Sequence, residues 1–319
     1  MKEVRTMKTF SKRILALLMS LIIALSLVMT ASASDVVYGD INKDSKINSI
    51  DALMILRHSV GAAAIADELL VAADVNGDGR INSIDALEIL MVSIGQLPYF
   101  SVEVKIKAPK NNNEILAVYN NAVKQARESI PAYKLDFSQK TVDSKFSGNL
   151  VEGMTEEELA ELRDSAIQDE SYSNIMRQGT TTALRNLPLL SDVTDASVFK
   201  SLSYERLATG EYSIVIKFKD EKNPTTSSPI VKLFGLPDYE TMKANLGEGG
   251  AEGLTMKVGD MYYKNGYISF VLDPRTGEFV SVDMSVDMAF TTKVSYILVF
   301  TLNMDVTMRT RMQYTNFIY

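Results

Sequence analysis

The spacing of apolar residues changes from helical to alternating along this chain. In the first part, apolar residues recur every three or four positions, which is the period of an amphipathic helix. Gly61, Gly95 and Pro131 follow three of these stretches and would end them. The pattern predicts four helices, at residues 51–60, 62–73, 85–94 and 114–130.

Strict alternation of apolar and polar residues dominates the C-terminal part. Val282, Met284, Val286 and Met288 alternate with serines and aspartates, and residues 296–308 continue the two-residue period. One buried and one solvated face is typical of an antiparallel sheet. Because the strands are long, we expect the sheet to curve around its helices. The predicted strands are residues 134–146, 211–218, 256–264, 267–273, 278–290 and 293–314.

Turns and short helices connect these strands. Asn265-Gly266 and residues 273–277 have turn composition and predict two hairpins. A capping box at Thr155 predicts a helix over 155–168, and residues 171–190 are predicted to be helical in part. Residues 101–319 are therefore predicted to form an α+β domain with a long, curved antiparallel sheet. This pattern resembles the half-barrel lipoprotein folds that carry hydrophobic ligands, and its methionine-rich face fits either a core or a ligand pocket.

A duplicated segment organises the first hundred residues. Residues 40–51 recur as residues 74–85, with a period of 34 residues, and each copy continues into a nearly identical helix. Side chains with oxygen occupy loop positions 1, 3, 5, 9 and 12 in both copies, and position 7 can supply a main-chain carbonyl, as in a calcium loop. The predicted metal ligands are Asp40, Asn42, Asp44, Lys46, Asn48 and Asp51 in the first loop, and Asp74, Asn76, Asp78, Arg80, Asn82 and Asp85 in the second.

Both loops depart from the usual EF-hand pattern. Position 12 is aspartate rather than glutamate, and residues 34–39 are too few for a helix entering the first loop. Position 6, which favours a positive φ, is Gly79 in the second loop but Ser45 in the first. A serine there costs about 1 kcal/mol, so we expect the first loop to bind calcium more weakly.

Two calcium loops that have only exiting helices resemble the dockerin module of cellulosomal proteins. The resemblance covers residues 38–97 and implies an all-α module that holds two calcium ions and binds a cohesin module of a scaffoldin. In dockerins, loop positions 10 and 11 and residues of the exiting helix contact the cohesin. From the residues alone, the isoleucines at position 11 fit core packing equally well. The implied contact residues are Ser49, Ile50, Arg57, His58, Ser83, Ile84, Met91 and Val92.

The N-terminus has the composition of a secretion signal. Five Lys and Arg residues in the first thirteen precede an apolar stretch at 14–28, and Ala31-Ser-Ala33 supplies small residues for cleavage. Residues 1–33 are therefore predicted to be a signal peptide, and the protein to be secreted and held at the cell surface by a scaffold, with no membrane span after cleavage. An uncleaved anchor is the alternative, although the apolar stretch is short for a span.

Composition narrows the chemistry of the C-terminal domain. A net charge of −7 argues against nucleic-acid binding, and the absence of cysteine excludes disulfides. His58 is the only histidine, which argues against Ser-His-Asp catalysis, and there is no tryptophan to stack on sugars. We expect a non-catalytic binding or structural domain, with a polysaccharide or an apolar ligand as its partner. The alternative is a carbohydrate-active enzyme, similar to a glycoside hydrolase but of unfamiliar type.

Overall fold

The chain divides between Ile94 and Gly95 into two units. The computed structural model describes residues 36–166, 169–247, 254–296 and 300–319. The predicted signal peptide, residues 1–33, lies outside the described residues. None of the described helices is both long enough and apolar enough to cross a membrane.

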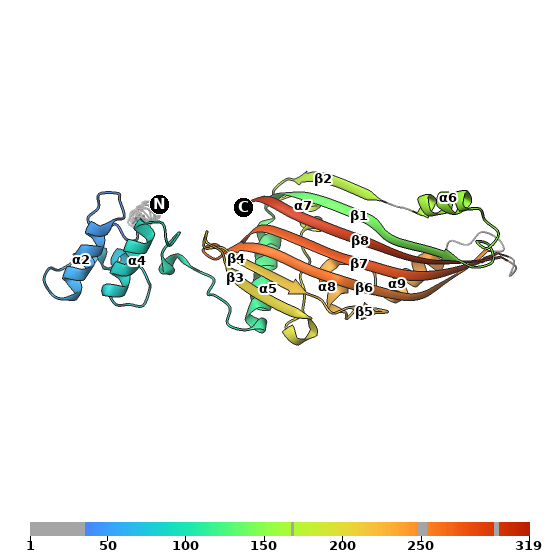
Figure 1. The fold of residues 1–319 in the computed structure, drawn as a ribbon. Coiled ribbons are helices and arrows are strands. Elements are labelled where there is room, and N and C mark those ends of the chain that lie inside the picture. The colour runs from blue at the N-terminus through green and yellow to red at the C-terminus, as the bar shows by residue number, and fades with distance from the viewer. Residues whose placement is uncertain (1–35, 167–168, 248–253, 297–299) are drawn as a thin grey trace, which may run out of the picture. The chain divides into compact units, whose positions relative to one another are not determined.

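The first unit is a pair of loop–helix repeats. The exiting helices, α2 (Ser49–Ser59) and α4 (Ser83–Ser93), pack against each other (Figure 1). Each begins at an asparagine N-cap, whose side chain accepts a hydrogen bond from the N–H two residues further on. The aspartate at the third helical position accepts the N–H of that asparagine and completes a capping box. The repeated sequence thus repeats its local structure.

The helix predicted at 62–73 is confirmed only in its second half. Only η1 (Asp67–Leu69) and α3 (Leu70–Ala73) are helical. Before them the chain folds back on the end of α2, where Nδ1 of His58 accepts the N–H of Ile65 at 3.1 Å. The alanines of this turn face solvent, so a helix there would have buried no apolar surface.

The segment after Gly95 is fixed on the second unit. Tyr99 and Phe100 are buried, and the Tyr99 hydroxyl donates a hydrogen bond to the carbonyl of Gly210. The guanidinium groups of Arg206 and Arg275 lie 5.5 and 5.0 Å from the centre of the Tyr99 ring. These residues lie just before the predicted start of the C-terminal domain at residue 101, yet they belong to its packing.

The second unit is built on one antiparallel sheet, which has eight strands in the described part of the chain. The strand order is β2-β1-β8-β7-β6-β4-β3, and β5 pairs with β6 in addition. The long antiparallel sheet is therefore as predicted. The strands are β1 (Ala132–Ser147), β2 (Glu170–Met176), β3 (Ser201–Arg206), β4 (Tyr212–Lys217), β5 (Glu221–Lys222), β6 (Leu254–Asp273), β7 (Glu278–Tyr296) and β8 (Phe300–Ile318).

The hairpin predicted at Asn265-Gly266 is wrong, because β6 runs through it as one strand with a shift in register. A Cβ on Gly266 would lie 2.7 Å from Cδ1 of Ile230, so the glycine lets this side chain of α8 (Pro229–Phe234) pack directly on the strand. The second predicted hairpin is confirmed: Gly277 donates its N–H to the carbonyl of Asp273 between β6 and β7.

Two further boundaries differ from prediction. Residues 171–176 form β2 rather than helix, because they pair with β1, and only α7 (Thr181–Asn186) is helical in that region. β7 continues to Tyr296 instead of ending at Phe290, so Tyr296 does not belong to the final strand.

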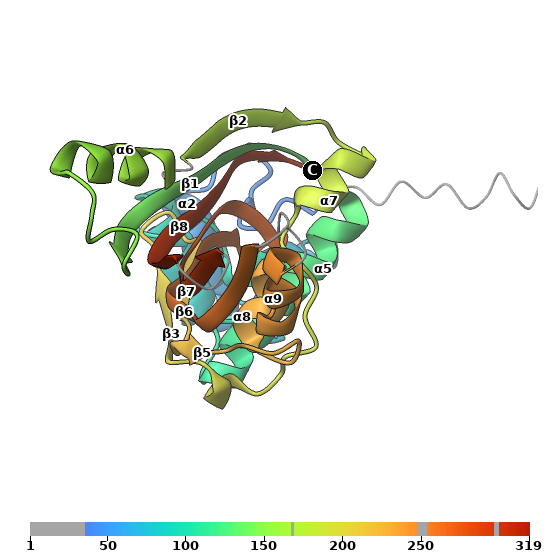
Figure 2. The same ribbon diagram turned by 90° about the vertical axis from the view of Figure 1, so that its right-hand side faces the viewer.

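Helices cover one face of the sheet, which curls around them in Figure 2. These helices are α5 (Asn112–Ser129), α7, α8 and α9 (Tyr239–Gly247). Tyr119 of α5 packs on Phe270 and Phe279, with ring centroids 5.4 and 6.4 Å apart. We call the helix-covered face the inner face.

The predicted capping box is confirmed before α6 (Glu156–Ala166), where the N–H of Thr155 donates to Glu158 at 2.7 Å.

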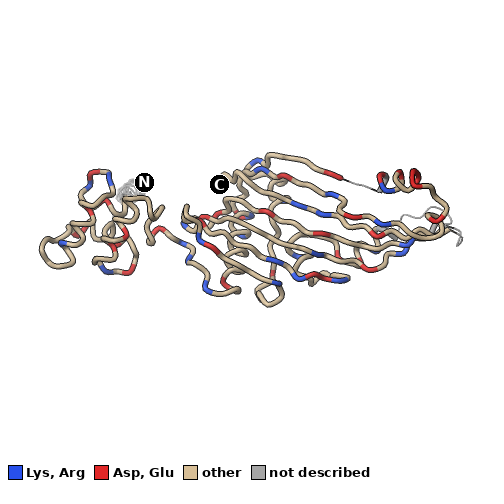
Figure 3. Tube along the Cα trace, viewed as in Figure 1, with Lys and Arg blue, Asp and Glu red and all other residues tan. Residues whose placement is uncertain are grey.

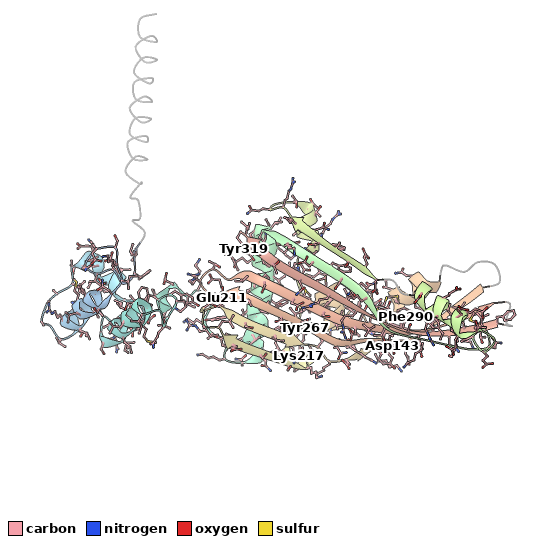
Figure 4. The ribbon with its side chains drawn as sticks, turned by 45° about the horizontal axis from the view of Figure 1, so that its top comes forward. Asp143, Glu211, Lys217, Tyr267, Phe290 and Tyr319 are labelled. Atoms are coloured by element: carbon pink, nitrogen blue, oxygen red, sulfur yellow. The ribbon has the colours of Figure 1, made fainter. Side chains whose placement is uncertain are left out.

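The opposite, outer face of the sheet is polar. Arg309 of β8 donates two hydrogen bonds, at 2.6 and 2.8 Å, to Asp287 of β7, and Arg311 makes a second bidentate pair with Asp283. Figure 3 shows positive and negative positions interspersed along these strands. Tyr267 of β6, labelled in Figure 4, donates to Asp283 at 3.2 Å. This face is held by ion pairs across neighbouring strands.

Candidate functional site

Main-chain hydrogen bonds hold the acidic side chains of the first loop in place. The Asp40 carboxylate accepts the N–H groups of Asp44 and Ser45 at 3.1 and 2.9 Å. The carboxylate of Asp51, which is fully buried, accepts the N–H of Ile41 at 2.9 Å. Loop positions 1 and 12 are thereby tied to the same turn of chain.

The second loop repeats these bonds. Asp74 accepts the N–H groups of Asp78 and Gly79 at 3.1 and 2.9 Å, and Asp85 accepts the N–H of Asn76 at 3.3 Å. At positions 3 and 5 of both loops, a side-chain oxygen accepts the N–H two residues further on, at 2.8–3.0 Å. The atoms that could bind a metal at these positions are oxygens, and oxygen is the ligand atom that calcium prefers.

The position-9 asparagines, which are predicted metal ligands, also cap the exiting helices. Oδ1 of Asn48 accepts the N–H of Ile50, and Oδ1 of Asn82 accepts the N–H of Ile84, both at 2.8 Å. Each asparagine is therefore a helix N-cap. An ion in the loop would be reached from this position through a water molecule, as is common at position 9.

The main-chain conformation of the first loop costs more free energy than that of the second. Positions 4 and 6 have positive φ in both loops, as expected for position 6. In the first loop they are Lys43 and Ser45, with φ of 59° and 65°; in the second they are Gly77 and Gly79, with 71° and 82°. Only glycine adopts this conformation without steric cost.

Negative charge is crowded in the second loop. Burial raises the pKa of Asp85, main-chain N–H groups lower it, and the neighbouring Asp74 and Asp78 raise it again. Within the described ranges, no group of three or more His, Cys, Asp or Glu side chains is arranged to hold a metal. A cation in either loop would therefore need amide and main-chain oxygens as well as aspartates.

The exiting helices expose matched apolar residues. Ile50 and Ile84 are 54% and 56% exposed, so neither packs in the core. Leu53 and Leu87, one turn further on, are 45% and 56% exposed. These two leucines were not predicted, although their spacing of three from the isoleucines places them on the same helix face. We call the four residues the paired apolar patches.

The other predicted contact residues are less uniform. Ser49, Ser83 and Arg57 are exposed. Met91 and Val92 are half-buried. His58 is also half-buried, and its Nδ1 is occupied by the N–H of Ile65, which gives it a structural task in the turn after α2.

A cavity of about 270 Å³ lies within the C-terminal unit. Its floor is the inner face of the sheet, where Leu135, Met284 and Tyr314 contribute side chains from β1, β7 and β8. The end of α7 and the end of α8 form its walls, with Phe234 and Arg185 among the lining residues. Part of the methionine-rich face is thus core and part lines this cavity.

Two loops of calcium-binding type, each followed by a single capped helix, define a duplicated loop–helix module. Residues 38–91 match the family model of the dockerin type I domain. The first unit is therefore a type I dockerin module, and such modules generally bind calcium.

One solved structure with similarity to this chain is that of the third cohesin of ScaC in complex with the ScaB dockerin from Acetivibrio cellulolyticus, which displays a type I interaction. The matched chain is 32% identical, with 21% of this chain and 94% of that chain covered, and the TM-score is 0.20. A TM-score this low carries no information on the fold of the remaining residues. No curated protein matches the chain.

Proposed function

We propose that the protein is a secreted component of a cellulosome-type assembly that binds a cohesin of a scaffoldin through its dockerin module. The observation that carries this proposal is the pair of identically capped helices that expose the same apolar residues, Ile50 with Leu53 and Ile84 with Leu87. A monomer gains nothing from exposing these side chains in matched positions, whereas an apolar partner surface would bury them. The dockerin of the similar solved structure is bound to a cohesin.

Binding is proposed to require two calcium ions, one in each loop. Asp40, Asn42, Asp44 and Asp51 would hold the first ion together with the carbonyl of Lys46. The equivalent residues of the second loop, with the carbonyl of Arg80, would hold the second. The calcium supplies the positive charge that lets clustered carboxylates lie together and so stabilises the loop that starts each helix.

Calorimetry and surface binding together test this proposal. The chain without residues 1–33 is titrated with calcium and then offered immobilised type I cohesins, in calcium, in magnesium and in chelator. We expect two calcium ions per chain, and cohesin binding in calcium alone, because magnesium demands a stricter octahedral geometry. Cohesin binding that persists in excess chelator would contradict the proposed calcium requirement.

For the C-terminal unit we propose a non-catalytic binding role, delivered to the assembly by the dockerin. The supporting observation is the cavity, because eleven of the fourteen residues that line it are apolar or aromatic, and none is a carboxylate. Glycoside hydrolysis needs two carboxyl groups facing the substrate, and this cavity offers none. Its lining instead suits a bound apolar group.

A further inference from the structure

We infer that the cavity of the C-terminal unit binds a single-chain amphiphile with an anionic head group, and that Arg185 pairs with that head group. This inference rests on the proposed binding role of the C-terminal unit. It adds the chemical class of the ligand, which follows from the shape, the lining and the charge of the cavity.

The walls of the cavity are held in place by hydrogen bonds. Nη1 of Arg127, on α5, lies 3.2–3.3 Å from the carbonyl oxygens of Leu184, Leu187 and Pro188, where the chain leaves α7. The Tyr133 hydroxyl donates to the carbonyl of Ala183 at 2.6 Å. The cavity is therefore preformed, which reduces the entropy lost when a ligand binds.

The opposite wall depends on a glycine. Gly235 ends α8 with a φ of 67°, and a Cβ at this position would lie 2.7 Å from Cδ1 of Leu189. The side chain of Leu189 thus packs directly on the main chain of Gly235. A side chain at position 235 would push Leu189 into the cavity or out of its place.

The floor of the cavity suits a flexible hydrocarbon. Met284 of β7 and Met312 of β8 are register partners on the inner face and both line the cavity. Phe137 and Tyr172 stack next to them, with ring centroids 4.8 Å apart and planes inclined by 15°. Methionine side chains adapt to varied apolar shapes, and the aromatic pair adds a flat apolar wall.

Charge and size select the ligand further. Arg185 is the one charged residue that lines the cavity, it is exposed, and it has no ion-pair partner within the described part of the chain. Its guanidinium would form charge-assisted hydrogen bonds to a carboxylate. A volume of about 270 Å³ lies just below the usual range for pockets that hold drug-sized ligands. It suits one short acyl chain rather than a two-chain phospholipid.

The test exploits the absence of tryptophan from this chain. Tyr172→Trp, in the full chain without its first 33 residues, places a single tryptophan at the cavity, whose fluorescence can be excited separately from that of the tyrosines. The reporter protein is titrated with dodecanoate below its micelle concentration, with dodecanol, and with a cello-oligosaccharide. Arg185→Gln is then added to the reporter, and Arg177→Gln, which changes an exposed arginine outside the cavity, serves as the matched control.

We expect one dodecanoate per chain, bound about tenfold more tightly than dodecanol. Arg185→Gln should abolish this preference, whereas Arg177→Gln should leave it unchanged. Equal affinity for the acid and the alcohol would overturn the role of Arg185. Saturation by the cello-oligosaccharide without dodecanoate binding would overturn the ligand class. If neither dodecanoate nor the cello-oligosaccharide binds, the inference and the proposed binding role of this unit are both refuted. Cohesin binding by the same sample would then show that the dockerin proposal still holds.

Discussion

The first loop of the dockerin module carries two side chains at positions where the second loop has glycine, and this difference predicts unequal calcium affinities. Lys43 and Ser45 have φ of 59° and 65°, where Gly77 and Gly79 have 71° and 82°. A left-handed conformation costs a residue with a Cβ about 1 kcal/mol relative to glycine. If calcium binding folds the loop, that cost is subtracted from the binding free energy.

Two such residues therefore weaken the first site by about 2 kcal/mol, which corresponds to roughly thirtyfold in affinity. Ser45→Gly should recover about half of this free energy and tighten the first site about fivefold. The matched substitution Gly79→Ser should weaken the second site by a similar factor. Space is not the reason, because a Cβ at Gly79 would meet no atom within 4 Å.

Calcium calorimetry on the wild type and the two single variants measures both affinities. The thermal unfolding temperature in saturating calcium is the control, because both variants should still fold. Two equal affinities in the wild type, or a first-site affinity that Ser45→Gly does not change, would show that backbone conformation does not set the difference. An unchanged second site in Gly79→Ser would contradict the same reasoning.

The remaining predictions concern the docking face, the connector and the ion pairs. Ile84→Asp alone should leave substantial cohesin affinity, because the equivalent patch at Ile50 can still bind. Ile50→Asp together with Ile84→Asp should abolish cohesin binding in a surface-binding assay. Loss of binding with one substitution would show that a single face is used. Tyr99→Ala should lower the free energy of unfolding of the C-terminal unit by about 3 kcal/mol in denaturant titration, without changing calcium binding. Arg309→Met should cost about 2 kcal/mol at neutral pH, less than for a fully buried pair because Arg309 is half exposed. Burial would raise the pKa of Asp287, but hydrogen bonds from Arg309 and Asn265 hold this pKa below its usual value. The ion pair therefore stabilises the fold at pH values above the ordinary aspartate pKa, and this stabilisation is lost as the pH falls. The difference between wild type and Arg309→Met should therefore narrow on acidification, and a pH-independent difference would contradict this account.

Local signals were sufficient for the dockerin module. Each loop is specified by residues within twelve positions of each other. The start of each helix is specified by an asparagine and an aspartate that are three positions apart. The structure repeats both features with nearly the same hydrogen-bond lengths. Whether Ile50 and Ile84 are core or surface was not fixed locally, because it depends on which face α2 and α4 turn toward each other.

The C-terminal unit shows where local signals fail. Asn265-Gly266 has the composition of a hairpin turn but forms a bulge, because β6 continues to pair with β7 on both sides of it. Residues 171–176 form a strand rather than a helix, because they pair with β1 at the edge of the sheet. The residues that pair with these segments, such as Ser285 with Tyr267 and Tyr133 with Met176, lie outside the short window of residues on which turn and helix composition is judged.

The sequence by itself determined the duplicated loops, their capped helices, the difference between Ser45 and Gly79, and a long antiparallel sheet with one apolar face. Each of these depends on side chains close together along the chain or on a simple period. Tertiary structure alone decided the exposure of the paired apolar patches, the docking of Tyr99 on the second unit and the cavity that brings Arg185 to Met284 and Met312. The patches are exposed because α2 and α4 pack against each other through their other faces. The docking of Tyr99 and the cavity arise because the curved sheet and its helices bring together residues about a hundred positions apart, and only the packed fold specifies which ones meet.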